Sequence, residues 1–153
     1  MTPGRAATAR QDWATPSEFL DAVEARFGTL AIDLAARADN AVAPLWLDEA
    51  VDSLTVDWAG LPGRRWLNPP FRHIAPWIAK AAELEHDTHE TIVLVPASVG
   101  ANWFADYVLD RARVVFVRPR LTFVGASDPY PRDLMLAVYG RGVRRGVEAW
   151  RWR

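Results

Sequence analysis

The chain has 153 residues, of which 50% are hydrophobic and 24% are charged, a composition typical of one globular domain with little room for a second. It contains no cysteine and only three scattered histidines, which excludes disulfides and thiolate chemistry and argues against a metal site. No apolar run approaches the ~20 residues of a membrane span, and the start of the chain lacks the order of a signal peptide. We therefore expect a cytoplasmic protein without membrane or metal partners.

The net charge of −1 conceals an asymmetry along the chain. Residues 1–110 hold 8 basic and 16 acidic side chains, a balance of −8, whereas residues 111–153 hold 10 basic and 3 acidic ones, a balance of +7. All basic residues except one lysine are arginines, whose planar guanidinium suits phosphate groups. The basic part of the chain is typical of a surface that binds a polyanion such as nucleic acid. Codon bias toward arginine is the plain alternative.

The first predicted helix follows a segment without any pattern. Residues 1–11 are small and polar, and we expect them to be disordered, so that residues 12–153 form a single domain. Thr15 is predicted to be an N-cap, and apolar residues at helical spacing then predict a helix over 16–27. Gly28 is expected to end that helix.

The rest of the chain alternates short apolar runs with helical patterns. Strands are predicted at 30–34, 45–47, 65–67, 91–95, 114–117, 121–124, 134–139 and, as an edge strand, 146–153, and helices at 74–84 and 103–108. This order predicts an α/β fold with a mostly parallel sheet and an antiparallel end. Seven of the eight tryptophans divide into core positions (Trp66, Trp77, Trp103), candidates for a pocket (Trp13, Trp46), and a terminal pair that belongs to an edge strand or a dimer contact (Trp150, Trp152).

The motif that indicates chemistry is Asn68-Pro69-Pro70-Phe71, which stands where a predicted strand ends. Ligands bind at this end of the strands in open α/β sheets. Two prolines remove two backbone donors and leave their carbonyls as acceptors, and the Asn68 side chain adds another. Such a set can hold an exocyclic amino group while the Phe71 ring stacks on a flat base. A plain turn is the alternative interpretation.

This tetrapeptide resembles the catalytic loop of amino-methyltransferases that use S-adenosylmethionine. Further segments in the same order are similar to the phage-type Dam family of DNA N6-adenine methyltransferases over residues 12–140. They include Asp12-Trp13-Ala14-Thr15-Pro16, Ile32-Asp33-Leu34-Ala35-Ala36 with Asn40, Asp52-Ser53-Leu54, Trp66-Leu67 before the tetrapeptide, Trp77-Ile78-Ala79-Lys80-Ala81, Val93-Leu94-Val95-Pro96-Ala97, Trp103-Phe104 and Arg120-Leu121-Thr122-Phe123. The resemblance implies a trimmed Rossmann-like methyltransferase sheet, an S-adenosylmethionine cofactor, a DNA substrate and action in the cytoplasm of a bacterial host cell.

The resemblance also implies roles for single residues. The catalytic residues are Asn68, Pro69, Pro70 and Phe71, and the cofactor-binding residues are Trp13, Thr15 and Pro16 beside the methionine end, Asp33 and Ala35 after the first strand, and Asp52 near the adenine. A structural cap at the end of a strand is the alternative for Asp33. One departure from the wider methyltransferase pattern is that Ala35-Ala36-Arg37 stands in place of a glycine-rich loop. We therefore expect the part of the fold that binds the cofactor to be shorter than in other methyltransferases.

DNA contacts are expected from basic residues that flank the motif, namely Arg72, His73, Arg118, Arg120 and Arg132, with Arg141, Arg144 and Arg145 further out. Because 153 residues leave no space for a separate recognition domain, we expect weak sequence discrimination or a very short target site, with binding dominated by phosphates. We also expect a monomer or weak homodimer. Two alternatives stay open. In the first, the chain methylates another acceptor, which is cytosine N4, RNA adenine or a protein glutamine. In the second, the chain is a non-catalytic nucleic-acid-binding module of the same fold.

Overall fold

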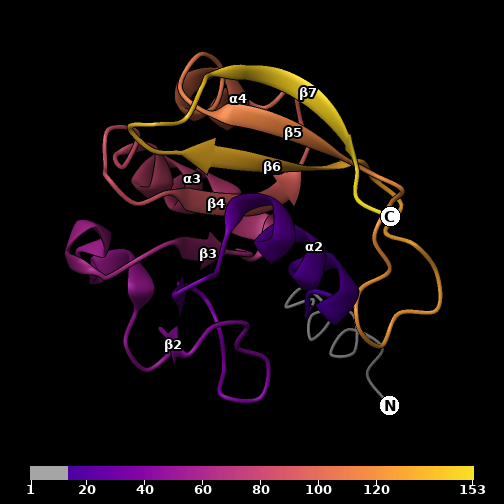
Figure 1. Cartoon of the computed structure of the whole chain (residues 1–153), viewed down its shortest axis with the longest axis horizontal. Helices are drawn as coiled ribbons and strands as arrows, with labels where there is room; N and C mark the ends of the chain where they lie inside the picture. The colour runs from indigo at the N-terminus through magenta and orange to yellow at the C-terminus, as the bar shows by residue number, and fades with distance from the viewer. Residues whose placement is uncertain (1–13) are drawn as a thin grey trace.

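The computed structural model describes residues 14–153, which form one seven-stranded sheet with helices on both faces (Figure 1). The strands are β1 (Ile32–Asp33), β2 (Leu45–Trp46), β3 (Arg65–Leu67), β4 (Thr91–Pro96), β5 (Arg113–Arg118), β6 (Leu134–Tyr139) and β7 (Gly146–Arg151). The helices are α2 (Ser17–Phe27), α3 (Ile74–Ala82) and α4 (Asn102–Tyr107), and short 3-10 turns are η2 (Ser53–Thr55), η3 (Trp58–Gly60) and η4 (Phe71–His73). The expectations for residues 1–11 and for Trp13 lie outside the described residues.

The strand order is β2-β1-β3-β4-β6-β5-β7. Neighbours from β2 to β4 are parallel, β6 runs antiparallel between β4 and β5, and β7 pairs in parallel with β5. The predicted α/β fold with a mostly parallel sheet and an antiparallel end is confirmed, and it is consistent with a Rossmann-like methyltransferase sheet. Because β5 runs in the direction of β3 and β4, the carboxyl ends of β1, β3, β4 and β5 lie along one edge, which we call the carboxyl edge.

Side chains of β4 alternate between two buried layers, which explains why its sequence is a continuous apolar run. Val93 and Val95 belong to the layer that includes residues of α3 and α4. Ile92 and Leu94 belong to the other layer, which includes α2 and the loop of residues 119–133, called the β5–β6 loop below. Figure 1 shows α2 on the opposite face of the sheet from α3 and α4.

The start of α2 differs from the prediction. Pro16, not Thr15, is the N-cap, and no side chain caps the helix. The Thr15 hydroxyl instead accepts a hydrogen bond from Asn68 Nδ2 at 3.1 Å. The hydroxyl that was expected to cap the helix therefore pairs with a side chain 53 residues away in the sequence. The helix ends at Gly28 as predicted, with a φ of 106° that favours glycine.

The strand predicted at 121–124 is wrong, because these residues belong to the β5–β6 loop. Leu121 and Phe123 are buried on the α2 side, so the alternation in the sequence does reflect burial. The backbone has no strand beside it, and the Val124 N–H donates to the Ala14 carbonyl at 3.1 Å. Alternating apolar residues here indicate packing onto a sheet face rather than membership of the sheet.

The end of the chain forms β7, the edge strand that the sequence predicts. Trp150 and Trp152 pack on Phe19 of α2, with ring centroids 5.8 Å and 5.3 Å away. Trp66 is fully buried as expected, whereas Trp103 is only half-buried. Within residues 14–153, none of the helices has the length and apolar composition to cross a membrane, and no cluster of acidic and histidine side chains in that range could hold a metal ion.

Candidate active site

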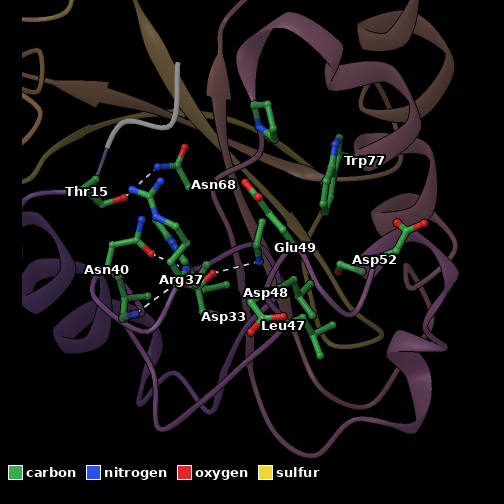
Figure 2. Close-up of a pocket in the computed structure, with 18 residues that line it drawn as sticks. Thr15, Asp33, Arg37, Asn40, Leu47, Asp48, Glu49, Asp52, Asn68 and Trp77 are labelled. Carbon is green, nitrogen blue, oxygen red and sulfur yellow. Dashed lines mark hydrogen bonds between the residues drawn. The ribbon is translucent and has the colours of Figure 1, made fainter. Parts of the chain in front are cut away.

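A cavity of about 280 Å³ lies at the carboxyl edge, beside the ends of β1, β2 and β3 (Figure 2). Its volume is near the lower bound of the ~300–1,000 Å³ that is typical of small-molecule sites. The loop after β1, the segment after β2, the loop after β3 and Trp77 of α3 supply the walls. This is the position at which open α/β sheets bind their ligands.

The tetrapeptide of residues 68–71 follows β3, and its first and third residues line the cavity. Asn68 is half-buried, and its Nδ2 donation to Thr15 Oγ1 at 3.1 Å fixes the orientation of the amide. The Pro70 carbonyl accepts the His73 N–H at 3.2 Å within η4. Of the two proline carbonyls that the sequence offers as acceptors, that of Pro70 therefore already has a partner inside the loop.

The Phe71 ring packs in an aromatic cluster formed with the β5–β6 loop. Its centroid lies 5.6 Å from that of Tyr130 and 6.3 Å from that of Phe123, in edge-to-face geometry, and the latter two rings are 5.6 Å apart. Phe71 and Tyr130 are both half-buried, so part of the cluster is a solvent-accessible apolar surface, and its Phe71 stands three residues after Asn68. The cluster holds the Phe71 ring in place, as a stacking platform requires.

Asp33 ends β1 and is 3% exposed. Its Oδ1 accepts the Ala35 N–H at 3.1 Å, and its Oδ2 accepts the Val42 N–H at 3.2 Å. Burial raises the pKa of this carboxyl to about 6, although the two hydrogen bonds act in the opposite direction. Asp33 thus holds the loop of residues 34–42 through two hydrogen bonds and also lines the cavity. The structural role and a position beside a ligand are therefore compatible for this side chain.

The cavity wall carries further charged residues that the sequence reasoning missed. Asp48 and Glu49 line it after β2, beside Asp52, which the sequence did predict at this site. The sequence contained a signal for Asp48 and Glu49, because both follow the predicted strand over 45–47 and therefore lie at the same edge of the sheet as Asp33. Arg37 is the one basic side chain among the described lining residues. The wall therefore suits a ligand with more positive than negative charge.

Trp77 was expected in the core, but it is half-buried and lines the cavity (Figure 2). Its ring stacks on Trp58, with centroids 6.3 Å apart and planes at 25°. The Trp58 Nε1 donates to the carbonyl and the hydroxyl of Ser53 at 3.0 Å and 3.1 Å, which makes the stacked pair a rigid, flat wall. Trp46, expected in a pocket, is 41% exposed and does not line this one, because β2 is an edge strand with both side chains exposed.

The structure brings most of the predicted site residues to this one cavity. Thr15, Asp33, Ala35, Asp52, Asn68 and Pro70 all line it. Three others do not: Pro16 is the N-cap of α2, Pro69 is buried, and Phe71 packs in the aromatic cluster. Asp33 and Asn68 meet because the carboxyl ends of the parallel strands β1 and β3 share one edge, and Thr15, which precedes α2, is joined to Asn68 by a hydrogen bond.

The basic residues expected to contact DNA also lie at the carboxyl edge. All five are exposed: Arg72 and His73 in η4, Arg118 at the end of β5, and Arg120 and Arg132 in the β5–β6 loop. Arg120 pairs with Asp133, with its Nη2 3.0 Å from Oδ1. Arg72 and His73 directly follow Phe71, and Arg132 lies near enough to Tyr130 to act on it electrostatically, so these three border the aromatic cluster. None of the five lines the acidic cavity.

The three outer arginines lie at the opposite edge of the sheet, between the end of β6 and the start of β7. Arg141 donates to Thr88 Oγ1 at 3.0 Å, and Arg145 Nη2 is 4.0 Å from a carboxylate oxygen of Glu85. Their partners belong to the turn before β4. These side chains therefore do not extend the basic surface beside the loop of residues 68–71.

Comparison with known proteins decides the family. A model of the family described as DNA N-6-adenine-methyltransferase (Dam) matches residues 5–134, which include β1 to β5, the loop of residues 68–71 and the β5–β6 loop. The chain belongs to this family. It is also 28% identical over 139 residues to the DNA N-6-adenine-methyltransferase of Escherichia phage T1, a match that covers 91% of this chain and 58% of the relative. The resemblance to phage-type Dam proteins is thereby confirmed.

A methyltransferase family implies a methyl donor, in general S-adenosylmethionine, and the cavity of this Dam chain fits that molecule. The donor has a flat base and two cationic groups against one carboxylate, and the cavity has a flat aromatic wall and mostly acidic charge. Trp66 adds a further feature. It is fully buried and lines the cavity, and its Nε1 has no hydrogen-bond partner among the described residues. Because an unpaired buried donor costs about 1–3 kcal/mol, a bound acceptor would stabilise it.

Proposed function

We propose that this Dam family chain transfers a methyl group from S-adenosylmethionine to N6 of a flipped adenine in DNA. The observation that carries the proposal is the position of the catalytic loop. It stands at the carboxyl edge between the acidic cavity, which its residue Asn68 lines, and the arginine-bordered aromatic cluster, which its residue Phe71 joins. One loop thus faces both a cofactor site and a base site.

The adenine amino nitrogen is a weak nucleophile because its lone pair is delocalised into the ring. Asn68 Oδ1 and the Pro69 carbonyl accept the two N6 hydrogens, which favours a tetrahedral nitrogen with its lone pair directed at the cavity. Bound S-adenosylmethionine supplies the electrophilic methyl group. Catalysis by these residues is alignment and electrostatic stabilisation of the positive charge that develops on N6. The N6 proton leaves after the transfer, so no strong general base is needed.

The aromatic cluster compensates for part of the cost of extruding the base. Flipping an adenine out of a duplex costs a few kcal/mol, and stacking on an aromatic side chain contributes about 1–3 kcal/mol per base in single-strand binders. Phe71 offers such a face, and Phe123 and Tyr130 hold its ring from the β5–β6 loop. Ordering of this platform before DNA arrives lowers the entropy cost of binding.

Charge separates the two ligands. Arg72, Arg118 and Arg132 are exposed at the carboxyl edge, where they can contact phosphates on either side of the flipped base. The carboxylates of Asp48 and Glu49 repel a DNA backbone from the cofactor cavity. Arg118 and Arg132 of the basic part of the chain thus lie on the DNA side together with Arg72 of the acidic part, whereas the three outer arginines lie at the opposite edge of the sheet.

The test combines product analysis with binding. The protein is incubated with DNA and S-adenosylmethionine, and the digested nucleosides are analysed by mass spectrometry, with N6-methyladenine as the expected product. Asn68→Ala should lower kcat by about 10²-fold or more, as the loss of a preorganised polar contact does, and should leave calorimetric binding of S-adenosylhomocysteine within a few-fold of wild type. Asn102→Ala, at an exposed asparagine outside the cavity, is the matched control.

The other outcomes identify what is wrong. Methylated cytosine N4, RNA adenine or protein glutamine without N6-methyladenine would overturn the acceptor. Nucleic-acid binding without any heat from S-adenosylmethionine would indicate the non-catalytic module. A near-normal rate for Asn68→Ala would overturn the catalytic assignment.

A further inference from the structure

We infer that Arg37 binds the carboxylate at the methionine end of the cofactor, a task that backbone amides of a glycine-rich loop commonly perform at such sites. The inference rests on the proposed function, because it concerns the ligand of that same cavity. It names a ligand-orienting residue that the sequence reasoning noted only as part of a departure from the usual loop.

The backbone amides after β1 are already used inside the protein. The Ala35 N–H donates to Asp33 Oδ1 at 3.1 Å, the Ala36 N–H to the Leu47 carbonyl at 3.0 Å, and the Arg37 N–H to Asn40 Oδ1 at 2.6 Å. In a glycine-rich loop such donors face the ligand and hold its anionic group. Here the loop is closed by its own hydrogen bonds, so an anionic ligand group must find its donor elsewhere.

Arg37 is placed to be that donor. It is the one basic side chain among the described residues that line the cavity, and Figure 2 shows it on the side of the cavity where Thr15, Asn40 and Asn68 lie. Its ion pair among residues 14–153 is with Asp39, at 3.4 Å between Nε and Oδ1, and both side chains are more than half exposed. An exposed pair of this kind contributes little, so a ligand carboxylate can replace it, and the guanidinium can hold both oxygens at once.

The remaining charges fix the direction in which the ligand lies. Four carboxylates line the same cavity, from Asp33, Asp48, Glu49 and Asp52, and they attract ammonium and sulfonium groups but repel a carboxylate. Figure 2 shows Arg37 and Trp77 at opposite sides of the cavity. The methionine carboxylate therefore lies at Arg37, and the adenine lies against the flat wall of Trp77.

A thermodynamic cycle isolates the contact. Calorimetry measures the binding of S-adenosylhomocysteine and of its carboxamide, in which a neutral amide replaces the carboxylate, to wild type, Arg37→Ala and Arg37→Lys. Arg37→Ala should weaken S-adenosylhomocysteine about tenfold, the lower part of the range for a hydrogen bond to a charged group because Arg37 is half exposed, and should leave the carboxamide unchanged. Arg37→Lys should recover part of the loss. Asp39→Ala, which removes the exposed ion-pair partner, should bind as tightly as wild type or tighter.

The cycle separates this inference from the proposed function. Equal losses for the two ligands, or no loss for S-adenosylhomocysteine, would refute the role of Arg37 while the cofactor site itself stands. If wild type binds neither ligand, the proposed function fails, and the inference fails with it. Thermal unfolding of Arg37→Ala should match wild type, because the side chain is exposed at the cavity mouth.

Discussion

Burial of Asp33 links the stability of the domain to pH, and Asp33→Asn tests that link. The carboxyl is 3% exposed, and its pKa in the folded protein is raised to about 6 by burial, against 3.8 as the ordinary value. Between these two values the folded state binds more protons at this site than the unfolded state does. The free energy of unfolding therefore falls as the pH rises through this window.

The magnitude follows from the two pKa values. A shift from 3.8 to about 6 corresponds to about 3 kcal/mol at 1.36 kcal/mol per pH unit. This cost is fully present above the folded pKa and disappears below the unfolded one, so roughly 2 kcal/mol of it develops between pH 4 and pH 7. Asparagine has no charge to desolvate, but it can accept only one of the two backbone N–H groups that Asp33 accepts, which costs about 1 kcal/mol at every pH.

The assay is urea unfolding of wild type and Asp33→Asn at several pH values from 4 to 7. Other titrating groups cancel in the difference between the two proteins. The free energy of unfolding of wild type, minus that of the variant, should fall by about 2 kcal/mol from pH 4 to pH 7. A difference that is flat with pH, or that rises, would refute the account of Asp33 as a buried, costly carboxylate.

Three further predictions concern the cofactor wall, the DNA surface and the core. Trp77→Ala should weaken S-adenosylhomocysteine in calorimetry by about tenfold or more because a stacking face is lost, whereas Trp46→Ala, outside the cavity, should not; equal effects would contradict the assignment of the wall. Arg132→Ala should reduce the slope of log affinity for DNA against log salt by about 0.9, the value for one phosphate contact, and an unchanged slope in fluorescence anisotropy would remove Arg132 from the interface. Asp87→Ala should lower the free energy of unfolding by about 3 kcal/mol, because it leaves the guanidinium of the fully buried Arg65 without the carboxylate 2.8 Å away. A loss below about 1 kcal/mol in urea would show that the carbonyls around Arg65 suffice.

Much of the framework could be predicted from local pattern. The helix ending at Gly28, the buried strand over 91–95 and the loop of residues 68–71 were all expected, and the structure places them as α2, β4 and the turn after β3. Each depends on signals that lie within a few residues, such as apolar spacing, a glycine with positive φ, or two prolines after a strand. The family followed from the order of several such segments and was confirmed by comparison.

What the sequence could not determine depends on which groups meet in space. The Thr15 hydroxyl is a good local cap, yet it accepts from Asn68, 53 residues away. Trp77 has helical spacing typical of a core residue, yet it faces a cavity because α3 begins at the carboxyl edge. Leu121 and Phe123 alternate as in a strand, yet they pack onto the face of the sheet and do not pair with one of its strands.

The sequence by itself therefore predicted the type of chemistry, because the acceptors of residues 68–71 are a local property of the chain. Only the tertiary structure decided how the wall of the cavity beside β1 is built. The amides of residues 35–37 are satisfied by partners that include the carbonyl of Leu47 on the segment after β2, a closure that no pattern within the loop indicates. Because those donors are used, the single guanidinium of Arg37 is left as the group that can meet a carboxylate in an otherwise acidic cavity.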